Sequence, residues 1–126
     1  MTLIHDWEAP GFRLKEAAQV VRLAGPDTGA TDSNVWRVSR DPGPVTPFPH
    51  RHNREEILVV LRGSLMTSLG DEEIKAEEGD TLIIPPMSTH NILEAGPEGV
   101  EYLAIFPVGN RWYHPDGRET PPLAPA

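Results

Sequence analysis

Three side chains that could bind a metal ion lie close together near the middle of the sequence. His50 and His52 are separated by one residue. Side chains on an extended strand return to the same face at every second residue, so two histidines at this spacing share a face on a strand. Glu56 follows at another even step, and the apolar run 57–61 then continues the strand. Imidazole and carboxylate groups on one wall are typical of a metal site.

A fourth candidate ligand is His90, which lies well separated in the sequence. The competing interpretation of the first three residues is a solvated edge strand that carries polar side chains. The presence of His90 favours a converging site over that interpretation. Glu55 competes with Glu56 as the carboxylate ligand, but strand parity favours Glu56 and predicts that Glu55 is an outward surface charge.

Composition limits the kinds of site and partner. The chain has 126 residues and no cysteine, so we expect one domain over residues 1–126, without disulfides or thiolate ligands. Any metal must then be held by nitrogen and oxygen. The net charge is -8 and the basic residues are scattered, which argues against a nucleic-acid partner.

No segment of the sequence resembles a membrane anchor. The first residues lack a basic region followed by a long apolar run, and no apolar stretch approaches the ~20 residues that span a bilayer. We therefore expect a soluble, cytoplasmic protein without membrane contact.

The elements that would position these residues are short strands. Fourteen prolines and eleven glycines disfavour long helices and suit tight turns. We expect a barrel core over about 19–107, a short helical or irregular N-terminal segment that includes 12–18, and a proline-rich C-terminal tail that wraps the outside. A turn at Gly63 and another at 95–99 should each separate two strands. The strands are predicted at 19–23, 34–39, 57–61, 64–69, 72–76, 81–84, 91–94 and 100–106.

Together these residues resemble the paired motifs of the cupin superfamily. The first motif is His50-x-His52-x3-Glu56-x6-Gly63, and the second runs from Gly79-x5-Pro85 to His90. The resemblance covers roughly residues 43–94. It implies an all-β fold, a double-stranded β-helix or jelly-roll barrel. This chain has Pro85-Pro86-Met87 where the family usually has Pro-x-Gly.

The resemblance also implies a ligand set and a class of ions. The metal ligands would be His50, His52, Glu56 and His90, with two positions of a six-coordinate ion left open. Such a nitrogen and oxygen site suits Fe(II), Mn(II), Ni(II), Co(II) or Zn(II), and the sequence does not choose among them.

Several activities are compatible with this resemblance. The favoured expectation is a dioxygenase-type oxidoreductase that acts on a small oxygenated organic molecule, with Glu56 as a base. The alternatives are a non-redox isomerase, cyclase or lyase that uses Glu94 or Tyr102 to transfer protons, and a binding protein without catalysis. Apolar residues on both faces of 57–61 and 81–84 require cover on the outside, and we expect a homodimer.

Overall fold

The computed structural model of the chain describes residues 2–14 and 18–121. Nearly all of its regular structure is β-strand, and two short 3-10 turns, η1 (Asp6–Glu8) and η2 (Pro26–Thr28), are the helical elements of the described ranges. The strands are β1 (Gly11–Leu14), β2 (Ala18–Ala24), β3 (Ser33–Arg40), β4 (Gly43–Pro44), β5 (Arg51–His52), β6 (Glu56–Leu69), β7 (Glu72–Glu77), β8 (Thr81–Ile84), β9 (His90–Pro107) and β10 (Trp112–Tyr113).

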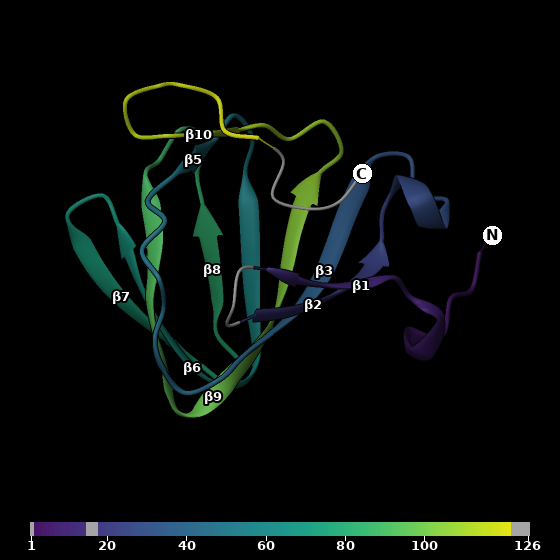
Figure 1. Cartoon of the computed structure of the whole chain (residues 1–126), viewed down its shortest axis with the longest axis horizontal. Helices are drawn as coiled ribbons and strands as arrows, with labels where there is room; N and C mark the ends of the chain where they lie inside the picture. The colour runs from purple at the N-terminus through teal and green to yellow at the C-terminus, as the bar shows by residue number, and fades with distance from the viewer. Residues whose placement is uncertain (1, 15–17, 122–126) are drawn as a thin grey trace.

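The strands form one rolled antiparallel sheet with a small second sheet across its end. The main sheet has the order β1-β2-β3-β9-β6-β7, with β4 added to β9 and β8 added to β6. Strands β5 and β10 pair with each other at the top of the molecule in Figure 1, above the ends of β6 and β8. The all-β jelly-roll prediction is confirmed.

Two long strands, β6 and β9, run through both halves of the roll and pair along most of their length. We predicted a turn at Gly63 and another at 95–99, and both predictions are wrong. The glycines Gly63 and Gly99 have positive φ values of 76° and 78°, and the strands bend there, at the bottom of Figure 1, without reversing. A Cβ added to Gly63 would overlap the carbonyl of Gly99, so the two bends fit against each other.

The terminal segments also differ from their predictions. The helix-compatible segment 12–18 begins with β1, which pairs with β2, while residues 15–17 lie outside the described residues. The C-terminal segment does not simply wrap the outside, because β10 pairs with β5 and buries Trp112. Residues 122–126 of the predicted proline-rich tail lie outside the described residues.

The core lies between the two halves of the roll. Strands β2, β3, β6 and β9 alternate buried and less buried residues over much of their length, as strands with one face on a core do. An aromatic cluster closes one end, where Trp36 makes edge contacts with Phe12, Phe106 and Trp112. In the described ranges there is no helix with the length and apolar character needed to span a bilayer.

Candidate metal centre

The first and last of the three histidines lie opposite each other on neighbouring backbone segments. His50 and His90 form an isolated antiparallel bridge, in which each backbone N–H donates to the carbonyl of the other residue at 3.0 and 2.8 Å. Two residues further on, His52 lies in β5, so its side chain returns to the same face. Residues 40 positions apart are thus held together by main-chain hydrogen bonds.

Glu56 reaches the same place from a different strand. We expected one strand to carry the two histidines into the apolar run, but the strand pairing is interrupted at 53–55 and resumes with β6 at Glu56. The carboxylate Oε1 lies 3.7 Å from Nε2 of His52 and 3.5 Å from Nε2 of His90. Glu56 is buried, whereas Glu55 is exposed, as strand parity predicted.

The backbone fixes which ring nitrogen of His50 and His90 faces the site. Nδ1 of His50 lies 2.6 Å from the carbonyl oxygen of Phe48, and Nδ1 of His90 lies 3.0 Å from that of Ser88. Because a carbonyl oxygen can only accept, each Nδ1 carries the hydrogen and donates it. Each Nε2 therefore presents a lone pair, as a metal ligand must.

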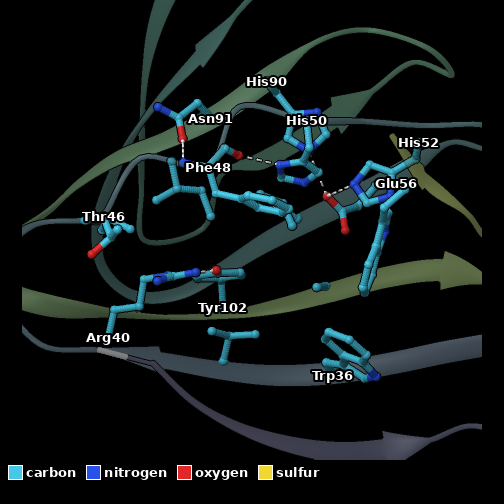
Figure 2. Close-up of a pocket in the computed structure, with 16 residues that line it drawn as sticks. Trp36, Arg40, Thr46, Phe48, His50, His52, Glu56, His90, Asn91 and Tyr102 are labelled. Carbon is cyan, nitrogen blue, oxygen red and sulfur yellow. Dashed lines mark hydrogen bonds and ion pairs between the residues drawn. The ribbon is translucent and has the colours of Figure 1, made fainter. Parts of the chain in front are cut away.

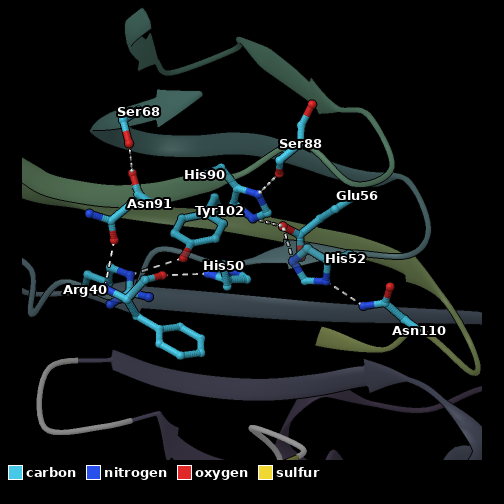
Figure 3. Close-up of polar contacts among 11 residues, drawn as sticks. Arg40, His50, His52, Glu56, Ser68, Ser88, His90, Asn91, Tyr102 and Asn110 are labelled. Atoms are coloured by element: carbon cyan, nitrogen blue, oxygen red, sulfur yellow. Dashed lines mark hydrogen bonds and ion pairs between the residues drawn. The ribbon is translucent and has the colours of Figure 1, made fainter. Parts of the chain in front are cut away.

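His52 is held in the same way by the side chain of Asn110 (Figure 3). The amide of Asn110 lies against Nδ1 of His52, with Nδ2 at 2.8 Å, while Oδ1 is buried without a partner. A half-turn of the amide exchanges its two ends and lets Oδ1 accept the hydrogen of Nδ1. We assign that orientation, because Oδ1 of Asn110 then has a hydrogen-bond donor. It also leaves the lone pair on Nε2 of His52, which faces Glu56.

These residues fit a divalent metal ion. One ligand nitrogen from each of His50, His52 and His90 lies within 4.8 Å of the other two. Nε2 of His52 and Nε2 of His90 are buried and have no hydrogen-bond partner. Burial, and then the nearby His90 and His50, lower the pKa of His52 from 6.5 to about 2, so its ring stays neutral and able to ligate. Glu56 adds the negative charge that an otherwise neutral site lacks.

The histidines form one wall of a cavity of about 90 Å³ inside the roll (Figure 2). Its lining combines the four candidate ligands with apolar side chains from several strands, among them Val38, Leu58 and Ile92. Phe48 stacks on His50, and Trp112 packs its edge against His52. A cavity with apolar walls and a few convergent polar groups is the usual form of a small-molecule site.

A second polar group of the lining is a pair formed by Arg40 and Tyr102. Nε of Arg40 donates to the phenol oxygen of Tyr102 at 3.1 Å (Figures 2 and 3). Burial is the main cause that raises the pKa of Tyr102 above 10.0, with a smaller contribution of the same sign from Glu56, against the opposing effect of Arg40. Tyr102 is therefore a neutral phenol at physiological pH.

The structure brings most of the predicted site residues together. His50, His52, Glu56, His90 and Tyr102 all line the cavity, but Glu94 is exposed and lies outside it. Ile92 pairs with Thr67 and Glu94 with Met66, so Leu93 is an extra residue in β9. This bulge reverses the strand parity after Ile92 and turns Glu94 away from the interior, which argues against a role in proton transfer.

Sequence reasoning missed several polar and aromatic residues of the site, among them Arg40, Asn110 and Trp112. Arg40 precedes the first motif, and Asn110 and Trp112 follow the second. The available signals were weak: Arg40 directly follows the predicted strand 34–39, and Asn110 follows a glycine in a segment with the composition of a loop.

A family model supports the resemblance seen in the motifs. The model described as "Cupin domain" matches residues 36–106, more than half of the sequence. The chain belongs to the cupin family. The matched segment runs from Trp36 on β3 to Phe106 on β9 and thus includes all four candidate ligands.

One curated relative of the cupin is auxin-binding protein 1 of Arabidopsis thaliana. The two are 30% identical over 87 residues, which is 62% of this chain and 43% of the plant protein. The match therefore spans less than half of the length of that relative.

Solved structures with the same fold include enzymes of different classes. The polyketide cyclase RemF from Streptomyces resistomycificus superposes with a TM-score of 0.73 at 20% identity, covering 97% of this cupin and 87% of RemF. Oxalate decarboxylase of Bacillus subtilis gives 0.72 at 20% identity, covering 85% of this cupin and 29% of the decarboxylase. That decarboxylase has Mn(II) centres. These likenesses show the fold.

Proposed function

We propose that this cupin is a metal-dependent enzyme that acts on a small oxygenated organic molecule. The observation that carries the proposal is the convergence of buried, unpartnered imidazole nitrogens with the carboxylate of Glu56 at one wall of a cavity. His50, His52, His90 and Glu56 would hold the ion. A bound divalent ion supplies Lewis-acid polarisation of a substrate carbonyl or hydroxyl oxygen.

The residues of the chain can move protons near that oxygen. Glu56 is a carboxylate whose second oxygen could accept a proton from a substrate carbon. Tyr102 is a neutral phenol in the same cavity and could donate a proton to an oxygen or carbon of the substrate. A base and an acid in one cavity favour a non-redox isomerase, cyclase or lyase.

A dioxygenase is the second candidate, and the number of ligands favours it. Four protein ligands on a six-coordinate ion leave two positions, which is enough for a substrate oxygen and dioxygen together. The enzymes with this fold, a polyketide cyclase and oxalate decarboxylase among them, support an enzymatic role without selecting between the two reactions.

Metal content and turnover test this proposal. Purified protein should contain one divalent ion per chain by mass spectrometry, and His90→Ala should lose it. Small oxo acids and diketones are then incubated in D₂O under argon with Zn(II) or Mn(II), and C–H exchange is followed by NMR. Exchange without dioxygen supports the non-redox reaction, whereas oxygen uptake that requires Fe(II) supports the dioxygenase.

Two neighbouring carboxylates provide a matched control. Glu56→Gln keeps the shape of the buried side chain but removes its charge and its capacity as a base, so exchange should fall at least 100-fold. Glu55→Gln changes an exposed residue and should leave exchange unchanged. Full metal content without any turnover of such substrates would contradict an enzymatic role.

We also propose that the protein is a homodimer. Ile83 is 56% exposed and Leu61 is 39% exposed, and β8 bonds to β6 alone among the described strands. A second copy packed on this face would cover both side chains. Sedimentation should give a dimer for the wild type and for Leu3→Lys, and a monomer for Ile83→Lys. A monomeric wild type would contradict the proposal.

A further inference from the structure

The guanidinium group of Arg40 lies in the wall of the cavity, and no carboxylate of the described residues pairs with it. Arg40 is the last residue of β3, and within the described ranges its side chain donates one hydrogen bond, from Nε to the phenol oxygen of Tyr102. No ion pair in these ranges includes Arg40. Arg40 is half-buried, so its guanidinium is partly removed from water, and an anion beside it would compensate for that loss of hydration.

Tyr102 fixes the direction of this group. Because the phenol oxygen accepts from Nε, the planar guanidinium is oriented and its two terminal amino groups remain for a ligand. The hydrogen of the phenol also remains, since Tyr102 is neutral and the hydrogen bond from Arg40 uses only its oxygen as an acceptor. Arg40 and Tyr102 together therefore offer a planar set of donors to an anion.

These donors suit a carboxylate in particular. A guanidinium binds a carboxylate through two parallel N–H···O bonds, and the phenol adds a third donor. The cavity of about 90 Å³ exceeds the space of one water several-fold but is small for a phosphate ester with its organic part. Among the residues that the structure describes, one arginine lines the cavity, whereas phosphate sites gather more positive charge or helix N-termini.

We infer that Arg40, oriented by Tyr102, binds the carboxylate of a small oxo or hydroxy acid whose second oxygen lies at the histidine wall. This inference rests on the proposed function for the second oxygen alone. Arg40 and the histidines lie on different sides of the same cavity in Figure 2, so a short acid can contact both. The charge of Arg40 would then select acids over neutral carbonyl compounds of the same shape.

The test compares an acid with its neutral amide on the metal-loaded protein. Binding of pyruvate and of pyruvamide is measured by calorimetry, and the Nε–H signal of Arg40 is followed by ¹⁵N NMR. We expect pyruvate to bind at least 10-fold more tightly than pyruvamide and to shift the Arg40 signal. Equal affinity for the two compounds would overturn the inference, and this comparison needs no variant.

Variants then test whether Arg40 causes the preference for pyruvate over pyruvamide. Arg40→Met should abolish the preference for pyruvate, and Arg40→Lys should retain part of it because the charge remains without the planar donor pair. Arg37→Met, on the same strand but outside the cavity lining, should behave as the wild type. Circular dichroism checks the fold of each variant. An unchanged preference in folded Arg40→Met would overturn the inference.

The outcomes separate this inference from the proposed function. Turnover of neutral diketones with no preference for acids would leave the metal-dependent enzyme standing and remove the carboxylate site. Arg40-dependent binding of pyruvate to a protein that retains no metal would leave the carboxylate site standing and remove the enzyme. Tyr102→Phe should weaken pyruvate binding while metal content stays unchanged, because it removes one donor and frees the guanidinium to rotate.

Discussion

Asn110 and His52 lie 58 positions apart in the chain, yet the amide of Asn110 is 2.8 Å from Nδ1 of His52. The contact joins the segment after β9 to the candidate metal centre. Because hydrogen bonds of this kind fix the tautomer and the ring orientation of a ligand, Asn110 should contribute to metal affinity without touching the ion.

We therefore predict that Asn110→Ala weakens metal binding by about 10- to 100-fold. Competition with a fluorescent chelator measures the change. Asn110→Asp keeps an acceptor oxygen at Nδ1 and should retain most of the affinity. An alanine variant that binds metal as well as the aspartate variant would show that Asn110 does not orient the ring.

The stability of the metal-free protein should fall on acidification. The pKa of His52 is about 2 in the folded state and 6.5 ordinarily, so between these values the unfolded chain binds a proton that the folded chain does not. Unfolding free energy should then decrease as pH falls below 6.5, by up to about 1.4 kcal/mol per pH unit for this one group. Urea unfolding in EDTA measures it. His52→Asn should reduce the slope, because it removes the group whose pKa is lowered in the folded state.

Acidification should also promote release of the metal ion. Protons compete with the ion for the imidazole nitrogens, and Nδ1 of each histidine is already occupied by its hydrogen bond. Equilibrium dialysis should show that metal affinity decreases as the pH falls. An affinity that does not change with pH would be inconsistent with ligation by three histidines.

The bend at Gly63 should not tolerate a side chain. A Cβ there would overlap the backbone of Gly99, and φ is positive, so Gly63→Ala should lower the unfolding free energy by at least about 3 kcal/mol. Gly70 also has positive φ, but a Cβ would meet nothing within 4 Å. Gly70→Ala should therefore cost only about 1 kcal/mol. Equal losses in denaturant unfolding would refute the packing argument.

Met87 occupies a position where the family usually has glycine, and its backbone keeps the left-handed conformation with φ of 63°. Its N–H donates to the carbonyl of His52 at 2.7 Å, so the loop cannot relax without losing that hydrogen bond. Met87→Gly should raise the unfolding free energy by about 1 kcal/mol relative to Met87→Ala, which keeps the strained φ. Chemical denaturation of the two variants decides the point.

Local patterns in the sequence predicted most of the segments that form strands, although not the continuity of β6 and β9, and they predicted the convergence of the histidine wall. Alternation of side chains put His50 and His52 on one face. Alternation and the spacing of the family motif together favoured Glu56 over Glu55, although the strand is interrupted at 53–55. Counted from His90, the same rule of alternation would put Glu94 on the inner face, but a single extra residue at Leu93 reverses the parity and no local signal marks a bulge. Arg40 and Asn110 could not be found in this way, since their roles depend on contacts between distant segments.

The bends show a similar limit. A glycine with positive φ is needed both for a reversing turn and for a bend within a continuous strand, so Gly63 reads the same way in the sequence in either case. The bend is distinguished from a reversing turn by the packing of Gly99 against Gly63, a contact between residues on different strands. Turn residues thus predicted where the chain changes direction, but not by how much.

The reciprocal main-chain hydrogen bonds between His50 and His90 have a consequence for how the protein acquires its ion. These hydrogen bonds hold the backbone of two ligands, His50 and His90, in place. The metal site is therefore formed as soon as the chain has folded. Binding of the ion to the folded protein should then be a fast bimolecular step, which can occur at any time after synthesis. Exchange of one divalent ion for another would require no refolding. The availability of each ion in the cell would then determine which one occupies the site.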